Sequence, residues 1–202
     1  MGYEPEIAHE FELDPADTRI VSIARLAQQC RMQVVAGAAI KNGLQKPHLG
    51  AFILGEDGSV SSYAKMHLGG CEPSYFTPGN ALKSISSQRE FIGLSICADS
   101  SKRSHPAAYY ASTGTTVYAA SAFLNADWYA TDSPRFAAYA LDFGMLCLMA
   151  NHGASVGTLV SVGNSAVWAA DGSLLASAAG TQSALVVATR TGQNWVGEVV
   201  VL

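Results

Sequence analysis

The sequence predicts an α/β protein, because strand-like apolar runs, helical patterns and hairpin turns alternate along the chain. With 202 residues, the chain is long enough for one domain with a sizeable core. It contains no internal repeat, linker or low-complexity tract. We therefore expect a single domain over residues 1–202.

The first predicted helix begins near Asp14. This residue can cap the helix, Pro15 suits the first helical position, and Asp17 lies at the positive end of the helix dipole. The apolar positions that follow have helical spacing and are expected to face the core: Ile20, Ile23, Leu26 or Ala27, and Cys30.

Strand-like and helical runs follow in alternation. Strands are predicted over 32–40, 49–54, 60–63, 91–96, 115–120 and 145–150. Turns at Lys41-Asn42-Gly43 and Glu56-Asp57-Gly58 join the first three of these strands. Helices are predicted over 105–112 and 133–142, and Ser133 is expected to cap the second, with Pro134 at its first position. The last eight residues read as an apolar strand, which should pair within a sheet or with another subunit.

The composition limits the classes of partner that the protein can bind. Charged residues make up 14% of the chain, against about 25% in ordinary globular domains, and 49% of residues are hydrophobic. This is more apolar surface than a monomer of this size needs to bury, so we expect a homodimer or a larger homo-oligomer. The net charge of −4 and the lack of a Lys/Arg cluster argue against nucleic-acid and anionic-membrane partners.

Targeting and cofactor signals are missing from the sequence. No apolar run reaches the roughly 18 residues of a membrane span, and the acidic first twenty residues do not resemble a signal peptide, so we expect a cytoplasmic protein. No nucleotide or metal motif occurs, so no cofactor or metal is implied. The cysteines have neither disulfide-framework nor metal spacing: Cys30, Cys71, Cys97 and Cys147.

Cys97 is the most informative of these cysteines. It ends an apolar run and is followed by a polar stretch, which puts its thiol at the carboxyl end of a buried strand, where open α/β sheets keep their sites. A lone cysteine in such a place is more often an inert small hydrophobe. Its alternative partners for a Cys-His hydrolase are His105 and His152, although both occupy positions that suit packing or capping. Cys71 should be exposed and Cys147 buried.

Five sequence blocks, in order, resemble the nitrilase, or carbon–nitrogen hydrolase, superfamily. The first three are Y-x-K-x-H-L from Tyr63, a loop with Glu72 that leads to F-x-P-G from Phe76, and a strand that ends in C-x-D at Cys97. The others match A-N-x-x-G, and G-x-S-x-V followed by a D-G-x-x-L-A hairpin: Ala150-Asn151-His152-Gly153, Gly163-Asn164-Ser165-Ala166-Val167 and Asp171-Gly172-Ser173-Leu174-Leu175-Ala176.

The resemblance implies both a fold and a chemistry. The fold is a four-layer α-β-β-α sandwich, which explains strands that are apolar on both faces. The chemistry is hydrolysis of a small amide or nitrile through a thioester on Cys97. Lys65 would stabilise the thiolate and, with the Ala98 N–H, hold the oxyanion, while Glu72 would line the site and position the lysine. The loops that select the substrate cannot be interpreted from one sequence.

One catalytic part of the family pattern is not matched. Members carry a first glutamate in P-E-x-x-x-T-G-Y, and Gly2-Tyr3 resembles only the end of it, so that Pro5-Glu6 is out of register. We therefore expect an N-terminally truncated member that hydrolyses amides poorly. The alternative is a catalytically impaired member that acts as a binding or subunit-interface module. Two further patterns of the family, R-A-x-E-N and R-F-P-E, are also not matched. In place of the first, the chain has Tyr139-Ala140-Leu141-Asp142-Phe143.

Overall fold

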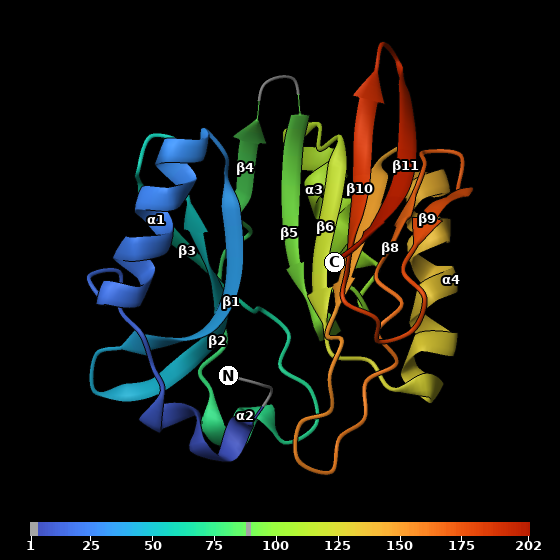
Figure 1. Ribbon diagram of the computed structural model, residues 1–202. Coiled ribbons are helices and arrows are strands. Elements are labelled where there is room, and N and C mark those ends of the chain that lie inside the picture. The colour runs from blue at the N-terminus through green and yellow to red at the C-terminus, as the bar shows by residue number, and fades with distance from the viewer. Residues whose placement is uncertain (1–3, 88–89) are drawn as a thin grey trace. The chain divides into compact units, whose positions relative to one another are not determined.

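The structure is a computed structural model that describes residues 4–87 and 90–202 (Figure 1). The contacts within the chain divide it into two compact units, the first ending at Lys83 and the second beginning at Ser84. Gly2 and Tyr3, which match the end of the family's first-glutamate segment, lie outside the described residues.

The first unit is a three-stranded antiparallel sheet with one long helix. Its sheet has the order β1-β2-β3, so each strand pairs with its neighbour in sequence through a short turn. The β1–β2 turn needs Gly43, whose φ of 60° is in the left-handed region. The elements are η1 (Pro5–Glu10), α1 (Thr18–Cys30), β1 (Val34–Asn42), β2 (Gln45–Leu54), β3 (Val60–Ala64) and α2 (Glu72–Tyr75).

Helix α1 starts later than the sequence predicts. The prediction of Asp14 as its cap is wrong, because the Asp14 carboxylate accepts the Ala16 N–H 2.8 Å away and closes a turn ahead of the helix. The cap is Asp17, which accepts the Arg19 N–H at 2.9 Å.

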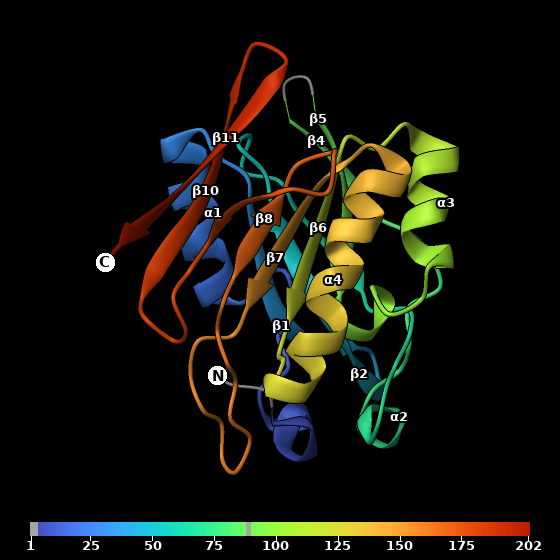
Figure 2. The same ribbon diagram turned by 90° about the vertical axis from the view of Figure 1, so that its right-hand side faces the viewer.

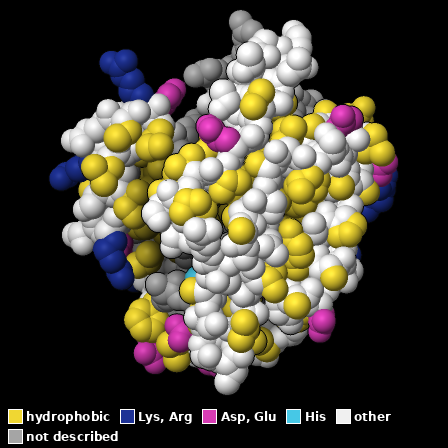
Figure 3. All heavy atoms as spheres, turned by 45° about the vertical axis from the view of Figure 1, so that its right-hand side comes forward, with side chains coloured by type: hydrophobic (Ala, Val, Ile, Leu, Met, Phe, Trp, Pro, Cys, Tyr) yellow, Lys and Arg dark blue, Asp and Glu magenta, His cyan; other side chains and the backbone are white. Residues whose placement is uncertain are grey.

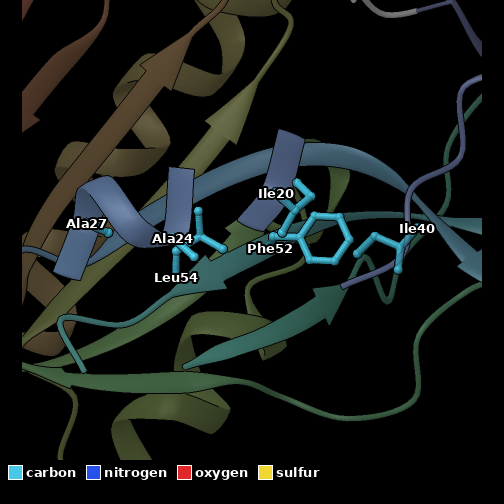
Figure 4. Close-up of a cluster of buried hydrophobic side chains, with 6 residues drawn as sticks. All are labelled: Ile20, Ala24, Ala27, Ile40, Phe52 and Leu54. Atoms are coloured by element: carbon cyan, nitrogen blue, oxygen red, sulfur yellow. The ribbon is translucent and has the colours of Figure 1, made fainter. Parts of the chain in front are cut away.

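The buried face of α1 also differs from the predicted one. Cys30 is exposed, as are Ile23 and Leu26, at 38% and 58%. Steps of three residues fall about 60° short of a full turn, so a repeated i, i+3 series drifts off one face of the helix. The face that packs on the sheet alternates three- and four-residue steps, and Figure 4 shows it with its partners: Ile20, Ala24, Ala27, Ile40, Phe52 and Leu54.

The second unit contains a six-stranded mixed sheet of order β4-β5-β6-β7-β8-β9 and a separate β10–β11 hairpin. Strands β5, β6 and β7 are parallel, and the remaining pairs in this sheet are antiparallel. The elements are β4 (Ser84–Ser87), β5 (Glu90–Ile96), η2 (Cys97–Asp99), α3 (Ser104–Thr113), β6 (Val117–Ala122), α4 (Ala126–Phe143), β7 (Leu146–Asn151), β8 (Ala166–Trp168), β9 (Leu174–Ser177), β10 (Ala184–Thr191) and β11 (Asn194–Val201).

Helix α4 begins at Ala126, so the predicted cap at Ser133 is wrong. The Asn125 side chain accepts the Trp128 N–H at 2.9 Å and is the actual cap. Pro134 lies inside the helix, where it has no N–H to donate to the carbonyl four residues earlier. The Ser-Pro pair resembles a helix start, and only the earlier cap reveals that about two turns of helix already precede Pro134.

The six-stranded sheet is covered on both faces. Figure 2 shows α3 and α4 on one face, where they pack on β5, β7 and β8. The other face presents Val117, Leu146 and Val167 to the β10–β11 hairpin, whose Val186 and Trp195 complete this cluster. The final strand therefore pairs within the chain, with β10, which is one of the two pairings expected for it.

The outer face of the β10–β11 hairpin is apolar and exposed. Leu185, Val196 and Val200 are 52%, 56% and 42% exposed, and hydrophobic side chains are visible on this side of the molecule in Figure 3. In the part of the chain that the structure describes, no helix combines the length and the hydropathy needed to cross a bilayer.

Gly93 on β5 should be sensitive to enlargement. A Cβ there would lie 2.8 Å from the ring of Tyr109, a residue of α3. We expect Gly93→Ala to lower the free energy of unfolding by about 1–3 kcal/mol, since overpacking forces the ring or the strand to shift. Chemical denaturation measures this. Gly37→Ala is the matched control, because a Cβ at that strand position meets nothing closer than 4.0 Å; equal stabilities of the two variants would contradict the prediction.

Candidate active site

The loop after β3 places Lys65 in the first unit. The Lys65 N–H donates to the Leu49 carbonyl at 2.8 Å, so the lysine continues the β2–β3 pairing. The chain then returns along it, and Gly79 donates its N–H to the Lys65 carbonyl at 2.8 Å. A Cβ on Gly79 would lie 2.2 Å from the Ala64 carbonyl oxygen, so this close return requires glycine. The F-x-P-G block is thus the segment that closes the lysine loop.

Lys65 and Glu72 form a buried ion pair. The Lys65 Nζ lies 2.7 Å from both carboxylate oxygens of Glu72, and the Gly69 N–H donates to Oε2 at 2.7 Å. The two residues are 1% and 2% exposed. An ammonium has three N–H donors, so at least one remains after both bonds to Glu72. The structure brings together these two predicted site residues, and it places Cys71 beside them as an exposed thiol, as predicted.

Cys97 lies at a sharp turn between β5 and η2. Its φ is 48°, in the left-handed region that a residue with a Cβ rarely adopts. Its carbonyl accepts two hydrogen bonds from Ser100, from the N–H at 2.9 Å and from Oγ at 2.7 Å. The thiol is partly exposed. A strained non-glycine residue that local bonds hold in place is a common feature of functional sites.

The Asp99 side chain stabilises this turn through a hydrogen bond. Its Oδ2 accepts the Ile96 N–H at 3.1 Å, so the carboxylate spans the turn that carries Cys97, and it is fully buried. From α4, the Tyr139 hydroxyl donates to the Ser100 carbonyl at 3.0 Å. Sequence reasoning did not select these two residues. The C-x-D spacing contained a signal for Asp99, because an acid at the third position of a helical turn can reach back to the N–H before it.

Ala98 follows the cysteine at the start of η2. The first N–H groups of a helical turn have no acceptor within that turn, so this position suits the predicted oxyanion donor. Lys65 and Glu72 belong to the first unit, and Cys97 and Ala98 belong to the second.

The two alternative histidines have other partners. His105 Nδ1 lies 2.9 Å from the Tyr118 hydroxyl, and the histidine is buried. His152 stacks on Phe123 with ring centroids 5.3 Å apart. It follows β7, two strands away from the end of β5, which is about 10 Å at the usual strand spacing. These contacts favour packing roles over that of a base for Cys97.

The A-N-x-x-G and G-x-S-x-V blocks meet at the end of β7. Asn151 accepts the Leu124 N–H at 2.8 Å and donates to the Gly163 carbonyl at 2.6 Å, while its own N–H donates to Ser165 Oγ at 3.0 Å. These bonds hold together the loops at the carboxyl edge of the sheet. Beside them is a cavity of about 300 Å³, whose lining includes His152, Gln182 and Ala184.

The four thiols should differ in reactivity. Cys147 is buried in β7, as predicted, and burial raises the pKa of its thiol to about 12. Since the thiolate is the reacting form, iodoacetamide at pH 8 should leave Cys147 unlabelled in the folded protein. The exposed Cys30 and Cys71 should react, as should the partly exposed Cys97. Peptide mapping by mass spectrometry gives the order, and labelling of Cys147 as fast as Cys30 would refute it.

Comparisons with known proteins identify a family for the chain. The sequence profile of the carbon-nitrogen hydrolase family matches residues 2–195. No curated protein matches the chain.

Solved structures share the fold at low sequence identity. An amidase from Nesterenkonia sp. matches with a TM-score of 0.75 and 23% identity, over 100% of this chain and 73% of the amidase. Nit3 of Saccharomyces cerevisiae, from branch 10 of the nitrilase superfamily, matches with a TM-score of 0.81 and 16% identity, over 98% of this chain and 72% of Nit3. A CN-hydrolase superfamily protein of Xanthomonas campestris with an arsenic adduct in its active site has a TM-score of 0.81 and 14% identity, over 98% and 73%. These likenesses confirm the fold that the sequence resemblance implied.

Proposed function

Because the chain belongs to the carbon–nitrogen hydrolase family, we propose that it cleaves the C–N bond of a small amide or nitrile through a thioester on Cys97. The observation that carries this proposal is the backbone of Cys97, held at a φ of 48° at the carboxyl end of β5. Non-glycine residues held in this sparsely populated region cluster at active sites. A related protein supports the assignment: in one structure of the Nesterenkonia amidase, acrylamide has added to the active-site cysteine.

For an amide, the reaction begins with attack of the Cys97 thiolate on the carbonyl carbon. The C–S bond forms as the carbonyl π electrons move to oxygen. The tetrahedral oxyanion then collapses, the C–N bond breaks, and the proton that the thiol released on forming the thiolate ends on the departing amine. Water then attacks the thioester, which releases the carboxylic acid and returns the thiol. Free cysteine has a pKa of about 8.5, so the thiolate must be stabilised at neutral pH.

Lys65 supplies that stabilisation in the proposal. Its ammonium lowers the energy of both the thiolate and the oxyanion, and the Ala98 N–H is the second oxyanion donor. Glu72 holds the ammonium in place, because its carboxylate oxygens accept two of the N–H donors within the buried ion pair.

The experiment that tests the proposal is acylation by an activated ester such as p-nitrophenyl acetate. This leaving group departs without a proton, so acylation needs no general acid. We expect a burst of p-nitrophenolate that approaches one equivalent of protein, and a mass increase of one acetyl group on the peptide that contains Cys97. Acylation confined to Cys30 or Cys71 would overturn the proposal, and a chain that does not acylate at all would match the non-catalytic binding or interface module.

We also propose that the chain assembles as a homodimer or a larger homo-oligomer. The charged fraction of 14% and the exposed apolar face of the β10–β11 hairpin support this. Obligate interfaces bury about 2,000 Å² or more and are rich in apolar side chains. Light scattering at micromolar concentration should give at least twice the monomer mass of 21.1 kDa, and a stable monomer would contradict the expectation.

A further inference from the structure

A buried polar network lies directly behind the turn that carries Cys97. It consists of Asp99 on η2, His105 at the start of α3 and Tyr118 on β6, all of them buried. The catalytic scheme above uses none of these side chains. Burial of an ionisable group raises the free energy of the folded state unless the group is paired. A cluster of three such groups next to the turn that carries the nucleophile therefore indicates a function for them.

Two distances link the three side chains of this network through His105. His105 Nδ1 lies 2.9 Å from the Tyr118 hydroxyl, and Nε2 lies 4.0 Å from Asp99 Oδ2. The same carboxylate oxygen accepts the Ile96 N–H, immediately before Cys97. Burial holds the pKa of Tyr118 well above its usual range, so this hydroxyl keeps its proton and can donate it to Nδ1. A neutral imidazole with Nδ1 as acceptor carries its proton on Nε2, on the side of Asp99.

The backbone connects the same groups. Successive turn bonds run from the Ser100 N–H to the Cys97 carbonyl, from the Lys102 N–H to the Asp99 carbonyl and from the His105 N–H to the Lys102 carbonyl, at 2.9, 3.2 and 2.8 Å. The His105 ring also contacts Tyr109 and Tyr118 edge-on, with centroids 5.3 and 6.0 Å apart. The ring is therefore fixed on several sides, with its Nε2 4.0 Å from the Asp99 carboxylate.

We propose that His105 is a positioning residue, which Tyr118 orients and which acts through Asp99 to hold Cys97 in its strained turn. This inference rests on the proposed function, in which Cys97 is the nucleophile. Displacement of a nucleophile by about 1 Å can cost on the order of 100-fold in rate, so a support of this kind would be visible in kinetics. His105 itself touches neither the thiol nor the substrate in this role.

Two substitutions of His105 separate the effect of its contact with Asp99 from the effect of its contact with Tyr118. Gln places an amide near the Nε2 position, facing Asp99, whereas Asn places one near Nδ1, facing Tyr118. We expect His105→Asn to lower the acylation rate constant of Cys97 about 10- to 100-fold, with the half-saturating ester concentration unchanged. His105→Gln should recover most of the rate. Equal rates in wild type, His105→Asn and His105→Gln would overturn the inference, as would equal losses in both variants.

A pair of tyrosine variants makes the test independent of His105 folding defects. Tyr118→Phe removes the hydroxyl that orients His105, and Tyr109→Phe removes a buried hydroxyl that instead donates to the Leu94 carbonyl at 3.1 Å. We expect Tyr118→Phe to slow acylation about 3- to 10-fold relative to Tyr109→Phe. Equal rates would overturn the inference.

A second readout separates this inference from the proposed function. The rate of iodoacetamide alkylation at Cys97 reports on the turn even if no ester acylates the protein. Failure of the proposed function would appear in the wild type as an absence of acylation. Failure of the inference would appear as identical Cys97 alkylation in wild type, His105→Asn and Tyr118→Phe.

Discussion

Replacement of Cys97 by alanine should abolish ester-dependent acylation and reduce any amide turnover by about 10⁴-fold or more. Loss of a nucleophile is among the largest effects in enzymes, because the other groups of the site act only on the intermediate that the nucleophile forms. Alanine also removes little volume from a partly exposed position, so the fold should persist. The measurements are the p-nitrophenolate burst and the release of ammonia from simple amides.

Cys71→Ala is the matched control for this experiment. Cys71 is an exposed thiol next to Glu72, so it could be alkylated or acylated without any part in the reaction. Its variant should keep the full burst. If the burst survives in Cys97→Ala and disappears in Cys71→Ala, the nucleophile has been assigned to the wrong residue.

Local sequence signals predicted where the candidate site residues lie in the fold. Cys97 stands out because an apolar strand stops there and a polar loop begins, and the structure places it between β5 and η2. Lys65 and Glu72 were selected by the resemblance, and the structure joins them in a buried pair. Near these residues the backbone conformation admits few other residue types. At Gly79, for example, the chain passes too close to Ala64 for any side chain.

The features that escaped prediction depend on residues far apart in sequence. The buried face of α1 is defined by Phe52 and Leu54 on β2, which no helical period of α1 can reveal. In the sequence, Asp99 falls in the polar stretch after Cys97, and Tyr118 falls within the predicted strand over 115–120. Only the packing of α3 on the sheet brings His105 between them. Periodicity reports on which residues are buried, whereas the partners of a buried polar group depend on the tertiary fold.

The second large effect is expected at Lys65. Lys65→Met keeps the length of the side chain and removes the charge, which leaves the Glu72 carboxylate buried without the ammonium that lies 2.7 Å from both of its oxygens. Removal of one partner from a buried ion pair costs about 3–5 kcal/mol of folding free energy. Lys46→Met is the control, since Lys46 is an exposed lysine of the same unit whose Nζ lies 3.2 Å from the Pro73 carbonyl. It should change stability by less than about 0.5 kcal/mol.

A double variant separates the structural part of the Lys65 effect from the chemical part. In Lys65→Met with Glu72→Gln, no buried charge is left unpaired, so denaturant titration should show that most of the lost stability returns. Acylation of Cys97 should stay as slow as in Lys65→Met, because the thiolate and the oxyanion still lack their ammonium. If acylation returned together with stability, Lys65 would be a purely structural residue, and the proposed catalytic part of the ion pair would be wrong.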